Sequence, residues 1–218
     1  MKTSHEAMLG EELMPADPTA VFVDAFTWHP ELPLGAILVR RHGCCAIVNT
    51  ETWEVEALLS TAKGAPDNFP LVKQQGYTWT FSVPSVLTPL HEAGFIPSGE
   101  YFLACNNVLQ NNIAVYRSTD PNPMKWKKEA FVEGFGNKYL PLHMGNVPDS
   151  RWAFFTIWAR KPHNGFICKV DPKTWKVVAK WDTGPDPHTC DCTVDGQYIT
   201  TVYSGHQAGQ SGLVVIHA

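Results

Sequence analysis

The chain has 218 residues, of which 44% are hydrophobic and 17% charged, and its formal net charge is −4. These values fit one globular domain with a hydrophobic core, and the negative charge argues against a nucleic-acid-binding platform. The longest apolar runs are only as long as a strand, and residues 1–19 lack the pattern of a signal peptide, so we see neither a membrane span nor an export signal. The six cysteines are too few for a disulfide-stabilised scaffold.

An internal repeat organises the sequence. Residues 48–59, "VNTETWEVEALL", match residues 170–181, "VDPKTWKVVAKW", and a looser copy begins at Val115. Each copy reads as a strand, a polar turn, a tryptophan and a second strand. Three histidines each precede a Pro-Ser-Gly, Pro-Asp-Ser or Val-Asp-Gly turn, and they lie 52 and 45 residues apart: His91, His143 and His188. This spacing is typical of a four-stranded propeller blade.

The repeat predicts an all-β fold, a β-propeller of four-stranded antiparallel blades with almost no helix. In chain order we expect a lead-in over 1–19 and a partial propeller over 20–218, with blades at 20–59, 91–132, 143–181 and 188–218 and an insertion at 60–90. The last blade ends before its fourth strand, which leaves about three and a half blades. We therefore expect a fragment, or half of an assembly that closes with another chain, because an open propeller exposes strand edges.

The first strand of a propeller blade lies beside the central channel, so histidines at the start of successive first strands are predicted to converge. On this reasoning His91, His143 and His188 form an arc at one mouth of the channel. Imidazole is the commonest transition-metal ligand, and three such groups suit copper, zinc or iron. The alternative is that each histidine is a loop residue bonded to a nearby carbonyl. Thr19 stands where the first blade would need its histidine.

A second set of residues follows the second strand of each blade, on the same face. These turns contain His42, His163 and His206, and we include His206, from the longest turn, as a candidate metal ligand. Turn histidines beside glycine are otherwise simply solvated.

Two further groups lie near the predicted channel mouth. Cys190 and Cys192 share a strand face with His188 by the two-residue period, and they either bind a soft metal or pack. Glu92 and Asp186 are candidates to orient ligands or move protons. The insertion, with its "YTWTF" stretch, is either a lid over the channel mouth or a hairpin that braces two blades.

The pieces "D-P-x-T-W-K-V-V", "G-P-x-P-H" and "D-G-x-Y" resemble the YVTN-type propeller repeats of surface-layer proteins and of enzymes related to nitrous oxide reductase. With histidines at the strand starts, the chain most resembles the copper-containing thiocyanate dehydrogenases. The resemblance implies a partial seven-bladed, periplasmic and often dimeric propeller, in which a copper centre oxidises thiocyanate to cyanate and sulfur. It carries ligand roles only to His91, His143 and His188, and it implies a small inorganic anion as substrate and a homodimer or the remaining blades as partner.

Two other classes of function are open to the same sequence. A propeller can be a binding scaffold without chemistry, in which case the histidines are structural. Another copper propeller enzyme, similar to nitrous oxide reductase, fits the same histidines. A lactonase-like hydrolase is disfavoured, because its hard divalent cation would need several carboxylates at the channel mouth, where this chain repeats histidine.

Overall fold

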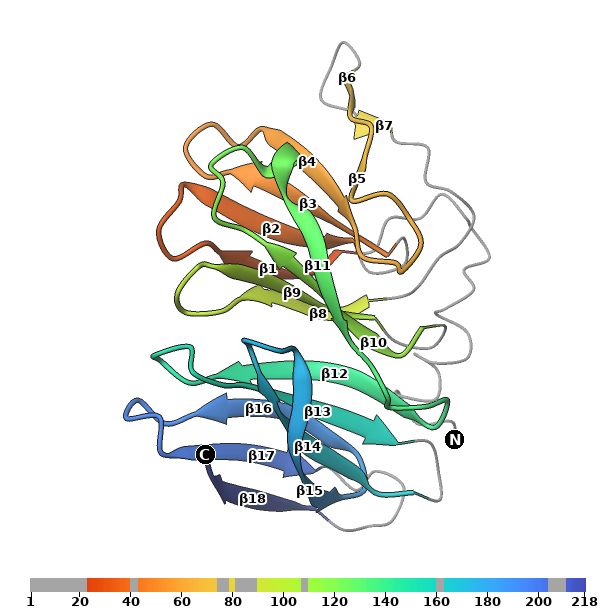
Figure 1. Ribbon diagram of the computed structural model, residues 1–218, viewed down its shortest axis with the longest axis vertical. Helices are drawn as coiled ribbons and strands as arrows, with labels where there is room; N and C mark the ends of the chain where they lie inside the picture. Colours follow the sequence, from red (N-terminus) through yellow and green to blue (C-terminus); the bar gives the residue numbers. More distant parts are fainter. Residues whose placement is uncertain are drawn as a thin grey trace.

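The computed structural model describes residues 23–39, 43–73, 79–80, 90–106, 110–159, 163–203 and 211–218, and these residues form strands, turns and one short 3₁₀ helix. Four antiparallel sheets lie one after another along the long axis of the molecule (Figure 1). The 3₁₀ helix η2 spans Pro123–Lys125, and the described residues contain no α-helix. The all-β prediction is confirmed. No helix in the described part has the length and apolarity needed to cross a bilayer.

Each sheet is built from strands in chain order, so every neighbouring pair is joined by a hairpin. The first sheet contains β1 (Val23–Trp28), β2 (Leu34–Val39), β3 (Cys44–Asn49), β4 (Val55–Ser60) and β5 (Asn68–Phe69). The second contains β8 (Leu90–Phe95), β9 (Tyr101–Asn106), β10 (Asn112–Arg117) and β11 (Lys127–Val132). The third contains β12 (Tyr139–Asn146), β13 (Ala153–Ala159), β14 (Gly165–Asp171) and β15 (Lys176–Gly184). The fourth contains β16 (Pro187–Cys192), β17 (Tyr198–Tyr203) and β18 (Gly212–His217).

The repeated Trp motif has a simple structural cause. In the turn from β3 to β4, the Asn49 carboxamide accepts hydrogen bonds from the next backbone N–H groups, and Trp53 has φ +60°. In the turn from β14 to β15, Asp171 accepts from Lys173 in the same way, and Trp175 has φ +54°. Short polar side chains that bond the backbone two residues on favour such turns. The two sequence copies therefore encode one turn.

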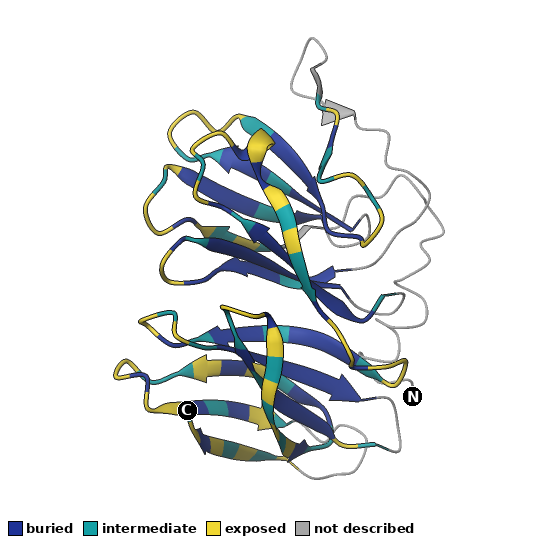
Figure 2. Cartoon of the chain, viewed as in Figure 1, coloured by how far each residue is buried: buried dark blue, intermediate teal, exposed yellow. Residues whose placement is uncertain are grey.

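The three largest apolar clusters each lie between two neighbouring sheets, and two smaller clusters lie in the first and third sheets. One cluster joins the first and second sheets and includes Leu38, Phe102 and Tyr116. A second joins the second and third sheets, and a third joins the third and fourth. Figure 2 shows the central strands as the most buried part of the fold. Because each sheet is buried against a neighbour, its position along the stack is fixed by apolar contact.

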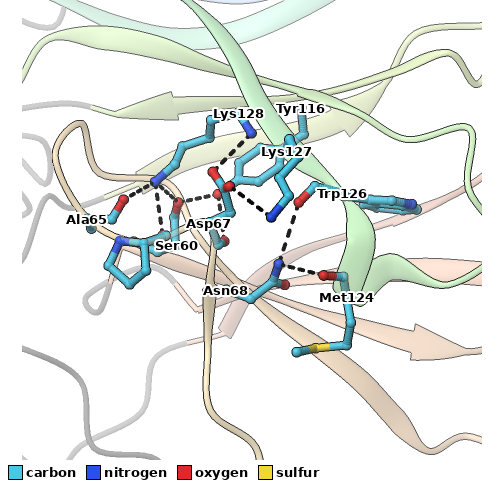
Figure 3. Close-up of polar contacts among 10 residues, drawn as sticks. Ser60, Ala65, Asp67, Asn68, Tyr116, Met124, Trp126, Lys127 and Lys128 are labelled. Carbon is cyan, nitrogen blue, oxygen red and sulfur yellow. Dashed lines mark hydrogen bonds and ion pairs between the residues drawn. The ribbon is translucent and has the colours of Figure 1, made fainter.

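The start of the insertion braces the first two sheets. The Lys128 ammonium group, from β11, donates to four backbone carbonyls of residues 60–66 at 2.8–3.0 Å (Figure 3). The Asp67 carboxylate accepts from the Lys128 N–H at 3.1 Å, and the Tyr116 hydroxyl donates to the Ser60 and Asp67 carbonyls. This part of the insertion follows the bracing alternative. Beyond it, β6 (Val72–Lys73) pairs with β7 (Trp79–Thr80), and the lid alternative concerns residues that lie mostly outside the described ones.

Candidate functional site

A β-bulge recurs at the same place in the first strand of each sheet. In β8 the bulge contains His91 and Glu92, because Leu90 pairs with Asn106 but Ala93 pairs with Ala104. The corresponding bulges contain Leu142 and His143 in β12, and His188 and Thr189 in β16. A bulge adds one residue, turns the strand and re-aims its side chains, and it is common beside functional sites. All three predicted histidines thus lie at bulges.

The bulges bring the three histidine rings together. The ring centres of His91 and His143 lie 4.6 Å apart, as do those of His143 and His188, and those of His91 and His188 lie 6.2 Å apart. The strands that carry them, β8, β12 and β16, are neighbours in the stack (Figure 1). The predicted convergence of these side chains is therefore present in the structure, and we call the three residues the histidine cluster.

Glu92 fixes the central ring of the cluster. The Nδ1–H group of His143 donates to Glu92 Oε2 at 2.8 Å, and the same oxygen accepts from the Met144 N–H at 2.8 Å. The Nε2 atom of His143 is buried and has no hydrogen-bond partner in the structure. A carboxylate on one ring nitrogen leaves the other nitrogen with its lone pair available, which is the arrangement of many metal-binding histidines. Of the two carboxylates considered from sequence, Glu92 is bonded to the cluster through His143.

Thr156, in β13, links two of the bulged strands. Its fully buried hydroxyl accepts from the His143 N–H at 3.2 Å and donates to the His188 carbonyl at 2.7 Å. Bulges disturb the regular ladder, and a hydroxyl can satisfy the backbone groups that they free. The sequence analysis missed Thr156, and its only signal is a threonine in the otherwise apolar and aromatic stretch "WAFFTIW".

The ring spacing is compatible with a shared metal ion. An imidazole nitrogen lies about 2.0–2.1 Å from a bound ion such as Zn²⁺, so the centre of its ring lies about 3.2 Å from the ion. Two such rings have centres about 4.5 Å apart when they subtend about 90° at the ion, and about 6.2 Å apart when they subtend about 150°. Among the residues that the structure describes, no group of three or more His, Cys, Asp or Glu side chains is placed to hold a metal ion. A shared ion would thus require the rings of His91 and His188 to turn about their Cβ–Cγ bonds, while Glu92 holds the ring of His143.

The cysteines near the cluster pack. The bulge in β16 interrupts the two-residue alternation on which the shared face with His188 was predicted. Cys190 is buried, its Sγ faces the carbonyls of His143 and Phe154 at 3.8 Å, and burial raises the pKa of its thiol well above the usual value. Burial also raises the pKa of Cys192. Cys190 belongs to the apolar cluster between the third and fourth sheets, and Cys192 packs against the same cluster, which favours the packing alternative.

The other predicted residues have different contacts or lie outside the described residues. Asp186 accepts a hydrogen bond from the indole N–H of the buried Trp158. The ring of His163 faces Tyr139, with centres 6.4 Å apart. His42, His206 and Thr19 lie outside the described residues. In β1 the equivalent bulge contains Asp24 and Ala25. The sequence alignment of the repeats, which put Thr19 at this position, was therefore wrong by about five residues.

His29, for which the repeat made no prediction, joins the first and second sheets. Its Nδ1 accepts from the N–H groups of Glu31 and Leu32 at 3.1 and 2.9 Å, and its Nε2 lies 3.0 Å from the Gly99 carbonyl and 3.2 Å from the Ser118 carbonyl. These contacts fit the neutral ring with a proton on Nε2. Burial lowers the pKa of His29, and the hydrogen bonds to the two carbonyls partly oppose this. His29 is a structural histidine.

Comparison with solved structures places the fold in the propeller class. The β-propeller domain of Swd1 from Myceliophteria thermophila has a TM-score of 0.61 and 10% identity, over 93% of this chain and 58% of that one. A functionally unknown protein from Desulfotomaculum acetoxidans gives 0.59 and 10%, over 85% and 50%. Kuenenia stuttgartiensis hydrazine synthase gives 0.49 and 11%, over 94% and 66%.

The sequence itself matches no family model and no curated protein. At these identities the likeness concerns the fold alone. The chain spans between half and two thirds of the length of the three structures.

Proposed function

We propose that the histidine cluster is a copper site and that the chain belongs to an oxidoreductase of the thiocyanate dehydrogenase type. The observation that carries the proposal is the approach of His91, His143 and His188, from three consecutive sheets, to ring separations of 4.6, 4.6 and 6.2 Å. The first strands β8, β12 and β16 are neighbours, so the repeat places the three imidazoles at equivalent bulges where they can act together as ligands. Imidazole nitrogen is a ligand that suits copper.

The residues divide into ligands and supporting groups. His91, His143 and His188 would hold the metal, and Glu92 would keep the His143 proton on Nδ1 so that Nε2 faces the ion. Bound copper would supply a centre that accepts electrons from a soft sulfur anion. The conversion of thiocyanate and water to cyanate and elemental sulfur releases two electrons and two protons. The substrate is therefore a small inorganic anion, and an electron acceptor is also needed.

The finer architecture belongs to the same proposal. We take the four sheets as propeller blades, about three and a half in number, of a ring that is completed outside this chain. Resemblance to the thiocyanate dehydrogenases supports seven blades and a periplasmic location. His206 is retained as a candidate fourth ligand on the sequence argument alone.

The test is the copper content of the purified protein after copper loading and desalting, measured by mass spectrometry. We compare the wild type with the triple variant His91→Ala, His143→Ala, His188→Ala, and with a control variant, His163→Ala and His217→Ala, which removes histidines outside the cluster. Copper retained by the wild type and the control but lost from a folded triple variant supports the proposal. Equal copper in all three, or none in a folded wild type, overturns it for this chain.

One observation favours the second candidate, a non-catalytic binding scaffold. Among the described residues, no group of three or more His, Cys, Asp or Glu side chains is placed to hold a metal ion. Under this alternative the cluster is a structural contact between sheets. The triple variant would then lose stability without any change in bound copper, so the same preparation distinguishes the two functions.

A further inference from the structure

The loop of residues 60–66, at the start of the insertion, points several backbone carbonyls at one place. The ammonium nitrogen of Lys128 lies 2.8–3.0 Å from four carbonyl oxygens of this loop (Figure 3). These oxygens belong to Ser60, Ala62, Ala65 and Pro66. An ammonium group has only three N–H donors, so four acceptors at these distances surround it as they would surround a bare cation.

The groups that contact this nitrogen are neutral. The ring centre of Tyr116 lies 6.0 Å from Lys128 Nζ, and the face of an aromatic ring attracts cations. The nearby Asp67 carboxylate has other partners, since it accepts from the backbone N–H of Lys128 at 3.1 Å and pairs with the Lys127 ammonium group at 3.6 Å. The described residues thus hold the cation with carbonyl dipoles and a ring face rather than with a carboxylate.

The distances and the type of ligand define the class of cation. Calcium binds oxygen at about 2.3–2.6 Å and magnesium at about 2.0–2.1 Å, and both are usually bound with the help of carboxylates. The four distances in this loop, 2.8–3.0 Å, are longer. Neutral carbonyl oxygens that replace a hydration shell are the ligands of potassium in selective channels. The loop therefore suits a monovalent cation of the size of ammonium or potassium.

The shape of the loop is fixed by contacts that do not involve Lys128. Gln110 binds Lys63 twice, because its Oε1 atom accepts from the Lys63 N–H at 2.7 Å and its Nε2 group donates to the Lys63 carbonyl at 3.1 Å. The Asn106 carboxamide donates to the Thr61 carbonyl at 2.8 Å. The N–H and hydroxyl groups of Thr61 both donate to the Gly43 carbonyl, at 3.0 and 2.9 Å. The carbonyls should therefore keep their positions when the ammonium group is removed.

Gly64 makes the turn that the carbonyls need. Its φ is +86°, a value that residues with a side chain rarely adopt. The Ala65 N–H donates to the Ala62 carbonyl at 3.4 Å across this turn. As a result, the carbonyls of Ala62 and Ala65 both reach the same nitrogen.

We propose that the carbonyls of residues 60–66 form a binding site for one monovalent cation, and that Lys128 fills this site with a tethered ammonium group. Carbonyls that lose their donor away from water are costly. A free ammonium or potassium ion should therefore bind when the Lys128 side chain is removed. Because the loop braces the first two sheets, binding of the ion should stabilise the fold. This inference does not rest on the proposed copper site.

The test is urea unfolding of Lys128→Ala in ammonium, potassium, lithium and tetramethylammonium chloride at equal ionic strength. Lithium is smaller than the site requires, and tetramethylammonium is larger and has no N–H group. A cation that binds only the folded chain, with a dissociation constant of about 50 mM, raises the ratio of folded to unfolded protein about 10-fold at about 0.5 M. We expect a gain of this size, with saturation, in ammonium and potassium and none in the other two salts.

Three controls should show no such selectivity. They are the wild type, in which the site is filled, Lys128→Met, whose side chain keeps most of the bulk of the lysine, and Lys127→Ala, which removes the neighbouring exposed lysine. Lys128→Ser is a second small variant, and its refolding in potassium or ammonium but not in lithium would support the proposal even if Lys128→Ala does not fold. The proposal is overturned if the small variants respond alike to all four salts, if both stay unfolded in every salt, or if the wild type shows the same selective gain.

Discussion

His29 allows a prediction in which pH and structure are linked. Its ring is 7% exposed, accepts two backbone N–H groups at Nδ1 and donates from Nε2 to carbonyls of the second sheet. His29→Gln removes this fixed arrangement. At about 1 kcal/mol for each net hydrogen bond, and more for groups left buried without a partner, we expect the free energy of unfolding to fall by about 2–4 kcal/mol at pH 8.

The sign of the pH dependence follows from the lowered pKa of His29. A proton on Nδ1 would face the two N–H groups that now donate to it, so the folded chain binds this proton less tightly than the unfolded chain. The contribution of His29 to stability is therefore complete above pH 6.5 and is lost as the pH falls through the folded-state pKa.

The assay for His29 is urea unfolding of wild type and His29→Gln at several pH values between 8 and 5. The difference between the two proteins should shrink toward acid pH. His217→Gln, at an exposed position, serves as the control and should change stability by less than about 0.5 kcal/mol. A difference that is constant with pH, or that grows toward acid, would refute the neutral-ring assignment.

Two other substitutions test the supporting residues. Glu92→Gln should weaken copper binding by about 10–100-fold while the protein stays folded, because the amide holds the His143 proton less strongly. A chelator competition titration measures the copper affinity. The control is Glu133→Gln, which replaces an exposed carboxylate paired with Lys63 and should leave the copper affinity unchanged. Lys128→Met should destabilise the fold by about 1–3 kcal/mol and speed proteolysis of residues 60–67, whereas Lys127→Met should do neither. Burial lowers the pKa of Lys128 to about 8, so the stability that Lys128 contributes should rise from pH 8 toward 10.5, and a fall in that window would contradict this reading.

The sequence predicts the strands well because their signals are local. Period-two alternation and the turn residues Asn49, Asp171, Gly99 and Gly196 mark hairpins that need no distant information. The bulges are different, since one extra residue in a strand has no fixed sequence code. For that reason the register of His143 was known only to within one residue.

The first sheet shows what happens where a local marker is absent. Its first turn, "HPELP", has no Ser-Gly or Asp-Gly pair to set the frame, so the sequence placed Thr19 at a position that β1 gives to Asp24 and Ala25. His29 was missed for a related reason. It occurs once, in that same turn, and its partners Gly99 and Ser118 lie 70 and 89 residues away.

The residues opposite the bulges indicate where the histidine cluster is held most firmly. Cys105, Thr156 and Val202 occupy this position in the second, third and fourth sheets. Of these three, only Thr156 has a hydroxyl, and that hydroxyl joins the His143 N–H to the His188 carbonyl. Glu92 adds a bond from the bulge of the second sheet to His143. The middle histidine is thus tied to both neighbouring strands, so any change that moves His143 should alter the whole cluster, whether the cluster binds metal or only joins the sheets.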